Sequence, residues 1–267
     1  MASIEYLSIV FVAGLVTALA TGLGAMPFFV VDEFSDRWNV ALWGVASGIM
    51  LAASLFGLVQ EGLAYGSTWL LVPGALAGIA LVAVGHEVAE GIDHHPEQYE
   101  RADFRKLLLI LGVLTVHSFP EGVAVGVSFA ELGLGGAETV ETLGVSIPVL
   151  AAFMTVAISI HNVPEGVAVS IPLRSMGVSE WRMVWWAVFS SLPQPIGAVI
   201  AYAFVSLARE FLPLGFGFAA GAMVYLVATE FLPEALEQGR DLPGGGRREL
   251  TAGVAAGVLA MVPLAFV

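Results

Sequence analysis

The chain has no cysteine and few charged residues for its length. Of its 267 residues, 12% are charged and 58% are hydrophobic, whereas soluble domains carry about 25% charged residues. The missing cysteine excludes disulfides and thiolate metal sites, but sites built from His and carboxylates stay open. The low charge and the long apolar runs together predict an integral membrane protein in a lipid bilayer.

Three further features narrow the function by what they exclude. No G-x-x-x-x-G-K-[ST] sequence occurs, so an ATP-binding loop is not predicted. The N-terminus has no basic stretch before its apolar run, so we expect no cleavable signal peptide. The formal net charge of −13 argues against nucleic acid as a partner and against a polybasic lipid anchor.

Apolar runs predict eight transmembrane helices of about 20 to 25 residues each. We expect them at residues 4–30, 40–62, 68–90, 106–130, 145–171, 181–207, 213–236 and 249–267. Nine of the ten Lys and Arg residues lie in loops or at span ends on one side of this topology, and Arg209 lies on the other. The positive-inside rule therefore places the odd-numbered loops in the cytoplasm and both termini outside. The predicted fold class is an all-α membrane protein with one transmembrane domain over residues 1–267.

One hexapeptide pattern, H-x-x-P-E-G, occurs twice inside apolar sequence. It begins at His117 in the fourth predicted span and at His161 in the fifth. A second repeat joins spans two and seven, where residues 45–51 match residues 218–224 at a constant offset of 173. The members of each pair run in opposite directions under the predicted topology. This is the pattern of an inverted-repeat bundle, with spans four and five at its centre and a substrate near the midplane.

The paired motif offers ligands for a cation. His117 and Glu121 lie four residues apart, as do His161 and Glu165, so each pair shares one helix face. The alternative is a buried His–Glu hydrogen bond that stiffens a kinked helix. Two copies, without Lys or Arg in the interior of the predicted spans, favour the cation. Nitrogen and oxygen ligands suit zinc, iron(II), manganese or cobalt.

The double motif resembles that of the ZIP (Zrt/Irt-like) metal-ion transporters, most closely their bacterial GufA-type branch. The resemblance covers essentially the whole chain and includes the Gly-x-Met-Leu stretch of span two. It implies that His117, Glu121, His161 and Glu165 form the principal metal site. It also implies a location in the bacterial cytoplasmic (inner) membrane and is consistent with a homodimer.

Two positions depart from the commonest family pattern. Ser118 stands where the first motif often has Asn, while Asn162 keeps the second copy of that position. Gln194 in span six stands where the family often has Glu, which removes a negative charge. Because a cation binds a neutral amide less strongly than a carboxylate, we expect the second metal position to be weakened.

Further pathway candidates lie outside the two motifs. In the family, span two approaches the same centre, and its candidates here are Met50 and Ser54. Glu230 and Glu234 of span seven are candidates for an inner exit station or for an ordinary polar helix end. The segment 86–105 is predicted to be a cytoplasmic loop rich in His and acidic residues, in which His86, Glu87 and Glu90 are candidates for a cytoplasmic metal site.

The sequence favours a secondary transporter over two alternatives. It predicts that a divalent transition metal is the transported substrate and enters the cytoplasm by alternating access. Zinc is the first candidate, and iron, manganese, cobalt and cadmium are the others. An intramembrane metalloprotease would need H-E-x-x-H, and residues 86–90 lack the second His, so we do not expect an enzyme. A membrane metal sensor is the other alternative. A measurement of metal flux would distinguish the two, because a sensor binds metal without transporting it.

Overall fold

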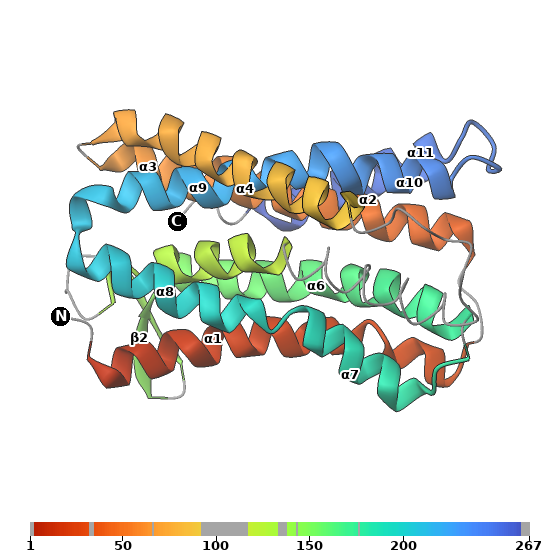
Figure 1. The fold of residues 1–267 in the computed structure, drawn as a ribbon, viewed down its shortest axis with the longest axis horizontal. Helices are drawn as coiled ribbons and strands as arrows, with labels where there is room; N and C mark the ends of the chain where they lie inside the picture. The colour runs from red at the N-terminus through yellow and green to blue at the C-terminus, as the bar shows by residue number, and fades with distance from the viewer. Residues whose placement is uncertain are drawn as a thin grey trace.

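Long helices lie side by side in two layers (Figure 1). The structure is a computed structural model, and it describes residues 3–31, 35–65, 67–91, 117–132, 138–142, 144–175 and 177–262. Its α-helices are α1 (Ile4–Leu23), α2 (Asp36–Ala52), α3 (Gln60–Ala64), α4 (Leu71–Gly91), α6 (Val149–Ser175), α7 (Glu180–Ser190), α8 (Pro193–Leu207), α9 (Leu212–Leu226), α10 (Leu232–Gln238) and α11 (Arg247–Ala260). Residues 117–128 form a further helix between α4 and α6. Strands β1 (Thr139–Thr142) and β2 (Val145–Pro148) pair as an antiparallel hairpin.

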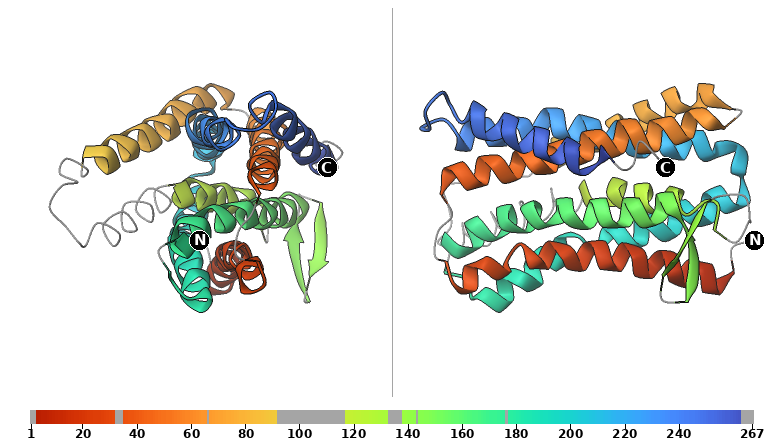
Figure 2. Two further views of the ribbon diagram at one scale, coloured as in Figure 1. Left: turned by 90° about the vertical axis from the view of Figure 1, so that its right-hand side faces the viewer. Right: turned by 180° about the vertical axis from the view of Figure 1, so that it is seen from behind.

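The two layers come from different parts of the chain. One layer contains α2, α3, α4, α9, α10 and α11, and the other contains α1, α6, α7, α8 and residues 117–128 (Figures 1 and 2). Within the layers, α4 packs along α9, α11 packs along α2, and α1 packs on α6 and α8. Small residues permit this packing: a Cβ added to Gly44 of α2 would lie 2.5 Å from the carbonyl oxygen of Leu250 in α11. The layers meet where α2 packs on α6.

Six helical stretches of the described chain are long and apolar enough to cross a membrane. They are Ile4–Phe29, Asp36–Ala64, Thr68–Val88, Val149–Ile171, Glu180–Leu207 and Arg209–Gln238, and they correspond to the predicted spans one, two, three, five, six and seven. Span four is described only from residue 117 onward. In span eight, α11 has 14 residues, fewer than the ~20 that cross a bilayer. A helical membrane protein is therefore confirmed, whereas eight spans and external termini stay predictions.

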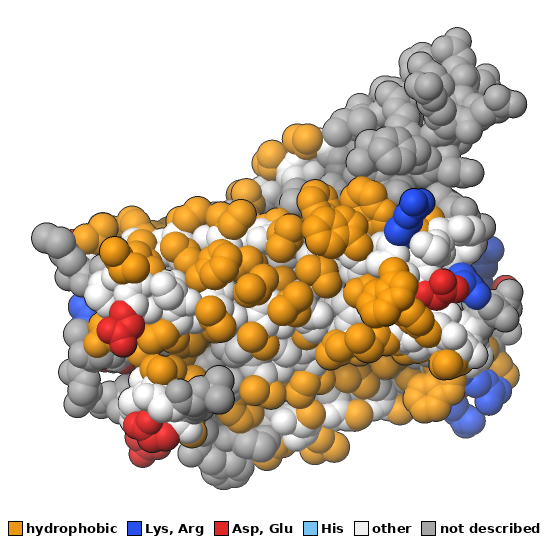
Figure 3. Space-filling model, turned by 90° about the horizontal axis from the view of Figure 1, so that it is seen from below, with side chains coloured by type: hydrophobic (Ala, Val, Ile, Leu, Met, Phe, Trp, Pro, Cys, Tyr) orange, Lys and Arg blue, Asp and Glu red, His pale blue; other side chains and the backbone are white. Residues whose placement is uncertain are grey.

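One broad face of the bundle is largely apolar, as expected of a surface that contacts lipid. Hydrophobic side chains cover the middle of the face in Figure 3, and the charged side chains lie toward its ends. Large exposed side chains include Trp69 and Leu207, which are 72% and 75% exposed. With no driving force to bury such groups away from hydrocarbon, exposure to lipid is their stable state.

Two predicted spans differ from the structure in their course. The span expected at 145–171 begins as a helix only at Val149, because residues Val145–Pro148 pair with β1. The span expected at 181–207 consists of two helices, α7 and α8, that are separated between Ser190 and Pro193. Proline lacks an amide hydrogen and clashes with the preceding turn, so Pro193 and Pro195 start a new helix rather than continue the old one.

The repeat between spans two and seven has a structural counterpart. A π-helical turn, Ala53–Val59, follows α2, and another, Val227–Phe231, follows α9. When the sequences of the two spans are aligned at their offset of 173, the two π-helical turns fall on overlapping positions. The helices that precede them, α2 and α9, run in opposite directions (Figure 1). Short π segments inside α-helices are frequent at functional sites, and the second one contains Glu230.

Candidate metal-binding site

Two helices of opposite direction carry the paired motifs. Residues 117–128 hold His117 and Glu121, and α6 holds His161 and Glu165 (Figure 1). All four residues are buried, with at most 2% of their surface exposed. The proline inside each motif does not interrupt its helix, so the four-residue spacing keeps each His and Glu on one face.

Glu121, His161 and Glu165 form what we call the buried cluster. Each residue offers one ligand atom, and these three atoms lie within 4.8 Å of one another. His161 Nε2 is 3.0 Å from Glu121 Oε1, while Glu165 Oε1 has no hydrogen-bond partner in the described structure. A buried polar atom without a partner is destabilising. Because imidazole and carboxylate ligands suit zinc and similar metals, the buried cluster fits a divalent cation.

His117 belongs to a different group, which we call the second cluster. It contains His86 of α4, His117 and Glu230 of the second π-helical turn. His117 Nε2 lies 3.0 Å from Glu230 Oε1 and 3.2 Å from His86 Nε2, and His86 also contacts Glu230. The structure thus brings together three of the four expected principal ligands and places the fourth with two pathway candidates. Because His86 and Glu230 lie in one layer and His117 in the other, the second cluster bridges the layers.

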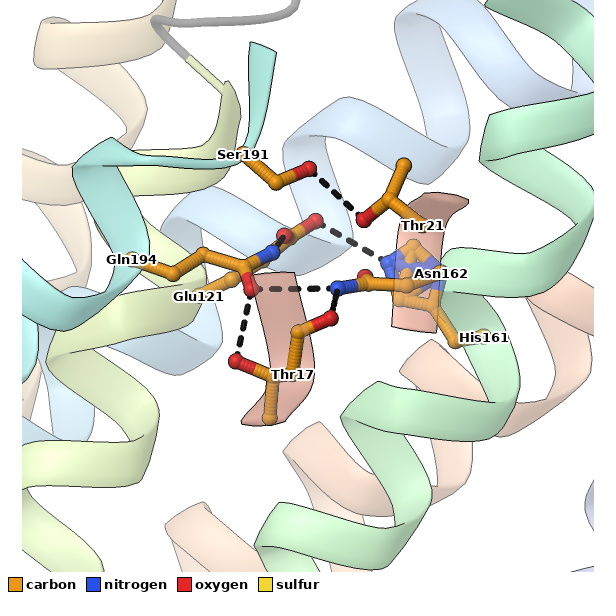
Figure 4. Close-up of polar contacts among 7 residues, drawn as sticks. All are labelled: Thr17, Thr21, Glu121, His161, Asn162, Ser191 and Gln194. Carbon is orange, nitrogen blue, oxygen red and sulfur yellow. Dashed lines mark hydrogen bonds and ion pairs between the residues drawn. The ribbon is translucent and has the colours of Figure 1, made fainter. Parts of the chain in front are cut away.

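Gln194 is tied into a hydrogen-bond network beside the buried cluster (Figure 4). Its Nε2 donates to Glu121 Oε2 at 2.5 Å. Its Oε1 lies 2.6 Å from the hydroxyl of Thr17 and accepts from Asn162 Nδ2 at 3.0 Å. Asn162 Nδ2 also donates to the main-chain oxygen of Thr17 at 2.7 Å. The amide oxygen of Gln194 therefore already has two partners, whereas Asn162 Oδ1 has none within the described residues.

The remaining predicted residues in the bundle interior lie on helices next to the clusters. Ser118 is buried beside His117 in sequence, and Met50 is fully buried in α2. Ser54 is also fully buried, and its hydroxyl has no hydrogen-bond partner in the described part of the chain. None of these three belongs to either cluster, each of which groups only His and carboxylates.

The candidates near helix ends are less well connected. Glu234 accepts a hydrogen bond from Gln238 at 2.8 Å and is exposed, and it joins neither cluster. Glu87 is exposed on α4. The side chain of Glu90 and most of the predicted loop 86–105, from residue 92 onward, lie outside the described residues.

Sequence reasoning did not identify the residues that α1 contributes. Thr17 and Thr21 are fully buried, and the hydroxyl of Thr21 lies 2.8 Å from that of Ser191. Their only signal in the sequence is two hydroxyl residues four positions apart on one face of an apolar span. Such residues commonly bond within their own helix, so the spacing alone does not indicate a site.

Comparisons with known proteins identify the family of this chain. Residues 82–265 match the family model described as ZIP Zinc transporter. The zinc transporter GufA of Myxococcus xanthus is 32% identical over 264 residues, which cover 94% of this chain and 96% of GufA. The zinc transporter ZIPB of Bordetella bronchiseptica is 32% identical, over 91% of this chain and 76% of ZIPB.

A plant relative is more similar in sequence but much longer. A protein of Arabidopsis thaliana, named as a candidate zinc transporter, is 42% identical over 225 residues. The match covers 84% of this chain but only 34% of the plant protein, so this chain spans about a third of that relative. The family resemblance predicted from the paired motifs is confirmed, and so is a role other than catalysis, because the family consists of transporters. This chain belongs to the ZIP zinc transporter family.

Proposed function

We propose that this protein moves divalent transition metals, zinc foremost, across the membrane into the cytoplasm by alternating access. The buried cluster is the observation that carries the proposal. It places two carboxylates and one imidazole inside a membrane-spanning bundle, with their ligand atoms within 4.8 Å of one another. Ionisable groups in a membrane are costly and mark ion pathways. A divalent cation would balance the charge of both carboxylates.

The relatives support zinc as the substrate, and the ligands set the range of metals. Proteins similar to this chain, such as GufA, are named zinc transporters. His and Glu also accept iron(II), manganese, cobalt and cadmium, so selection among them depends on geometry rather than on ligand type. We propose that the metal is a transported substrate and that it sheds water when it enters the buried cluster.

The second cluster provides an exit from the buried one. His117 is one helical turn from Glu121, so both clusters draw a ligand from the same helix. The side chains of His86 and Glu230 are 21% and 25% exposed, whereas Glu121 and His161 are fully buried. Under the positive-inside topology, His86 lies toward the cytoplasmic end of span three. We propose that a metal released from the buried cluster regains water here.

We also propose one firm metal position rather than two. Gln194 contributes its NH₂ group, which cannot bind a cation, toward Glu121 and uses its oxygen for Thr17 and Asn162. Asn162 and Ser118 are left as weak supports of a second position. The family resemblance extends the proposal to a homodimer in the bacterial inner membrane.

The decisive test is metal flux into proteoliposomes. Wild-type protein should accumulate radioactive zinc, and the Glu165→Ala variant should lose uptake because a charged ligand is removed from the buried cluster. Glu237→Ala is the matched control, since Glu237 is exposed on α10 and lies in neither cluster. Normal uptake by folded Glu165→Ala would refute the site, and zinc binding without flux in the wild type would favour a sensor.

Substrate range is tested by competition. Unlabelled iron(II), manganese, cobalt and cadmium are added to zinc uptake assays of wild type and His161→Ala. We expect the variant to change the order of competing metals, because an imidazole favours zinc over manganese. An identical order in both proteins would remove His161 from the selecting ligands.

A further inference from the structure

Thr17 of α1 reaches the surroundings of the buried cluster through two of its atoms. Its hydroxyl lies 2.6 Å from Gln194 Oε1, and its main-chain oxygen accepts a hydrogen bond of 2.7 Å from Asn162 Nδ2 (Figure 4). We propose that Thr17 is a positioning residue for the metal site. Thr17 holds the Gln194 side chain, and the amide of Gln194 in turn fixes the Glu121 carboxylate. The inference rests on the proposed metal transport and deepens it.

The direction of each hydrogen bond in this network follows from one main-chain carbonyl. A carbonyl oxygen only accepts, so the Asn162 atom that faces Thr17 must be the NH₂ group. The same NH₂ group lies 3.0 Å from Gln194, where the amide must therefore present its oxygen. The nitrogen of Gln194 then faces Glu121 Oε2 at 2.5 Å. The main-chain oxygen of Thr17 thus sets the orientation of both amides. The Thr17 hydroxyl, whose single hydrogen faces Gln194 Oε1 at 2.6 Å and the main-chain oxygen of Gly14 at 2.8 Å, is a second contact that holds the Gln194 oxygen.

The position of Thr17 is itself fixed by close contact between α1 and α8. A Cβ added to Gly14 would lie 2.6 Å from Pro195 Cα, so the two backbones touch there. One turn beyond Thr17, the hydroxyls of Thr21 and Ser191 lie 2.8 Å apart. Thr17 lies between these two contacts on the same helix. Because groups that orient a ligand must be rigidly held, this packing suits a positioning role.

The network leaves one oxygen of Glu121 and one oxygen of Asn162 directed away from the Gln194 amide and available to a cation. With Oε2 of Glu121 held by Gln194, Oε1 faces His161 at 3.0 Å. With its nitrogen committed to Thr17 and Gln194, Asn162 keeps Oδ1 without a hydrogen-bond partner in the described structure. Mutation of residues that orient metal ligands in this way typically changes metal affinity by about 10- to 100-fold.

Three variants test the role of the hydroxyl. Thr17→Val keeps the shape and removes the hydroxyl, Thr17→Ser keeps the hydroxyl, and Ser8→Ala removes an exposed hydroxyl of α1 that donates to the main-chain oxygen of Ile4. We expect Thr17→Val to raise the KM for zinc by about tenfold, with a smaller change in the maximal rate. The absorption spectrum of bound Co²⁺ should also change. Thr17→Ser should resemble the wild type, and Ser8→Ala should stay within about twofold of it, since Ser8 is exposed and lies in neither cluster.

A double-mutant cycle separates positioning from packing. If Thr17 acts through Gln194, then Thr17→Val should have no further effect on KM in a Gln194→Leu background. Additive effects, or a wild-type KM and Co²⁺ spectrum in Thr17→Val, would overturn the proposal. If Thr17→Val aggregates, Thr17→Ala gives the same comparison with a smaller side chain. Absence of zinc flux in the wild type would instead refute the proposed function.

Discussion

The two clusters contain the same ligand chemistry in different surroundings. The buried cluster has two carboxylates and one imidazole, and its Glu121 is fully buried. The second cluster has one carboxylate and two imidazoles, and its Glu230 side chain is 25% exposed. Burial strengthens the electrostatic attraction between a cation and its ligands, whereas partial exposure lets water compete. This difference supports the proposal that the metal binds in the buried cluster and is released at the second cluster.

We expect the largest loss of zinc uptake when a negative charge is removed from the buried cluster alone. Glu121→Gln removes a negative charge from the buried cluster but keeps a side chain of the same shape. We expect zinc uptake in proteoliposomes to fall by roughly a hundredfold, because bonds to a buried charged group contribute most. Glu210→Gln, at an exposed position, is the control. Uptake within twofold of wild type would place the binding role elsewhere.

The second cluster should affect release more than binding. In His86→Ala, we expect the maximal uptake rate to fall by about tenfold, as for other groups that support a metal ligand. Zinc affinity of the detergent-purified variant, measured by titration calorimetry, should stay unchanged because the buried cluster is intact. A loss of affinity as large as the loss of rate would contradict the division between binding and release.

A change at Gln194 should make the buried cluster more like a two-metal site. Gln194→Glu restores a carboxylate next to Glu121 and frees an oxygen for a cation. We expect bound zinc to rise from one to two ions per monomer, measured by equilibrium dialysis and metal analysis. Gln238→Glu, in which the amide partner of Glu234 is changed, is the matched control. One zinc in both variants would show that charge at position 194 does not limit the second position.

The smallest effect concerns a contact outside both clusters. The hydroxyl of Tyr65 donates to Glu131 Oε1 at 2.9 Å. Burial is the larger cause that raises the pKa of Tyr65 above its usual value, and this hydrogen bond is the next. A raised pKa means that this contribution to stability is present below about pH 10 and lost as the pH rises further. Tyr65→Phe should lower the unfolding free energy by about 1 kcal/mol at neutral pH.

The pH dependence provides the check on that contact. Thermal unfolding of the wild type should lose stability above about pH 10 more steeply than that of Tyr65→Phe, because only the wild type has this hydroxyl to ionise. The KM for zinc should be the same in both proteins. Parallel stability curves would contradict the role of the hydrogen bond.

The membrane class and the buried cluster could be predicted because both follow from local patterns. Apolar runs predict spans directly, and the His–Glu spacing predicts a shared helix face. The opposite directions of the two motifs then bring Glu121, His161 and Glu165 together. What the patterns could not show is which neighbour His117 meets, since Glu230 is 113 positions away and lies in the other layer.

Other features were hidden for similar reasons. The partner of Gln194 in α1, Thr17, is separated from it by 177 positions, and two threonines spaced four apart in an apolar span do not indicate that contact. The helix predicted at 145–171 includes Val145–Pro148, because this second strand of the hairpin continues into the apolar sequence of α6. Short apolar runs do not distinguish a strand from a helix.

The two π-helical turns change how the spans that contain them must be drawn. Each turn accommodates one more residue than an α-helical turn, which rotates everything beyond it by about 100°. A helical wheel drawn straight through residues 218–234 is therefore out of phase by one position after Phe231. The same holds after Val59 in the repeated span. The residues beyond each turn therefore point about 100° away from the direction that such a wheel assigns to them.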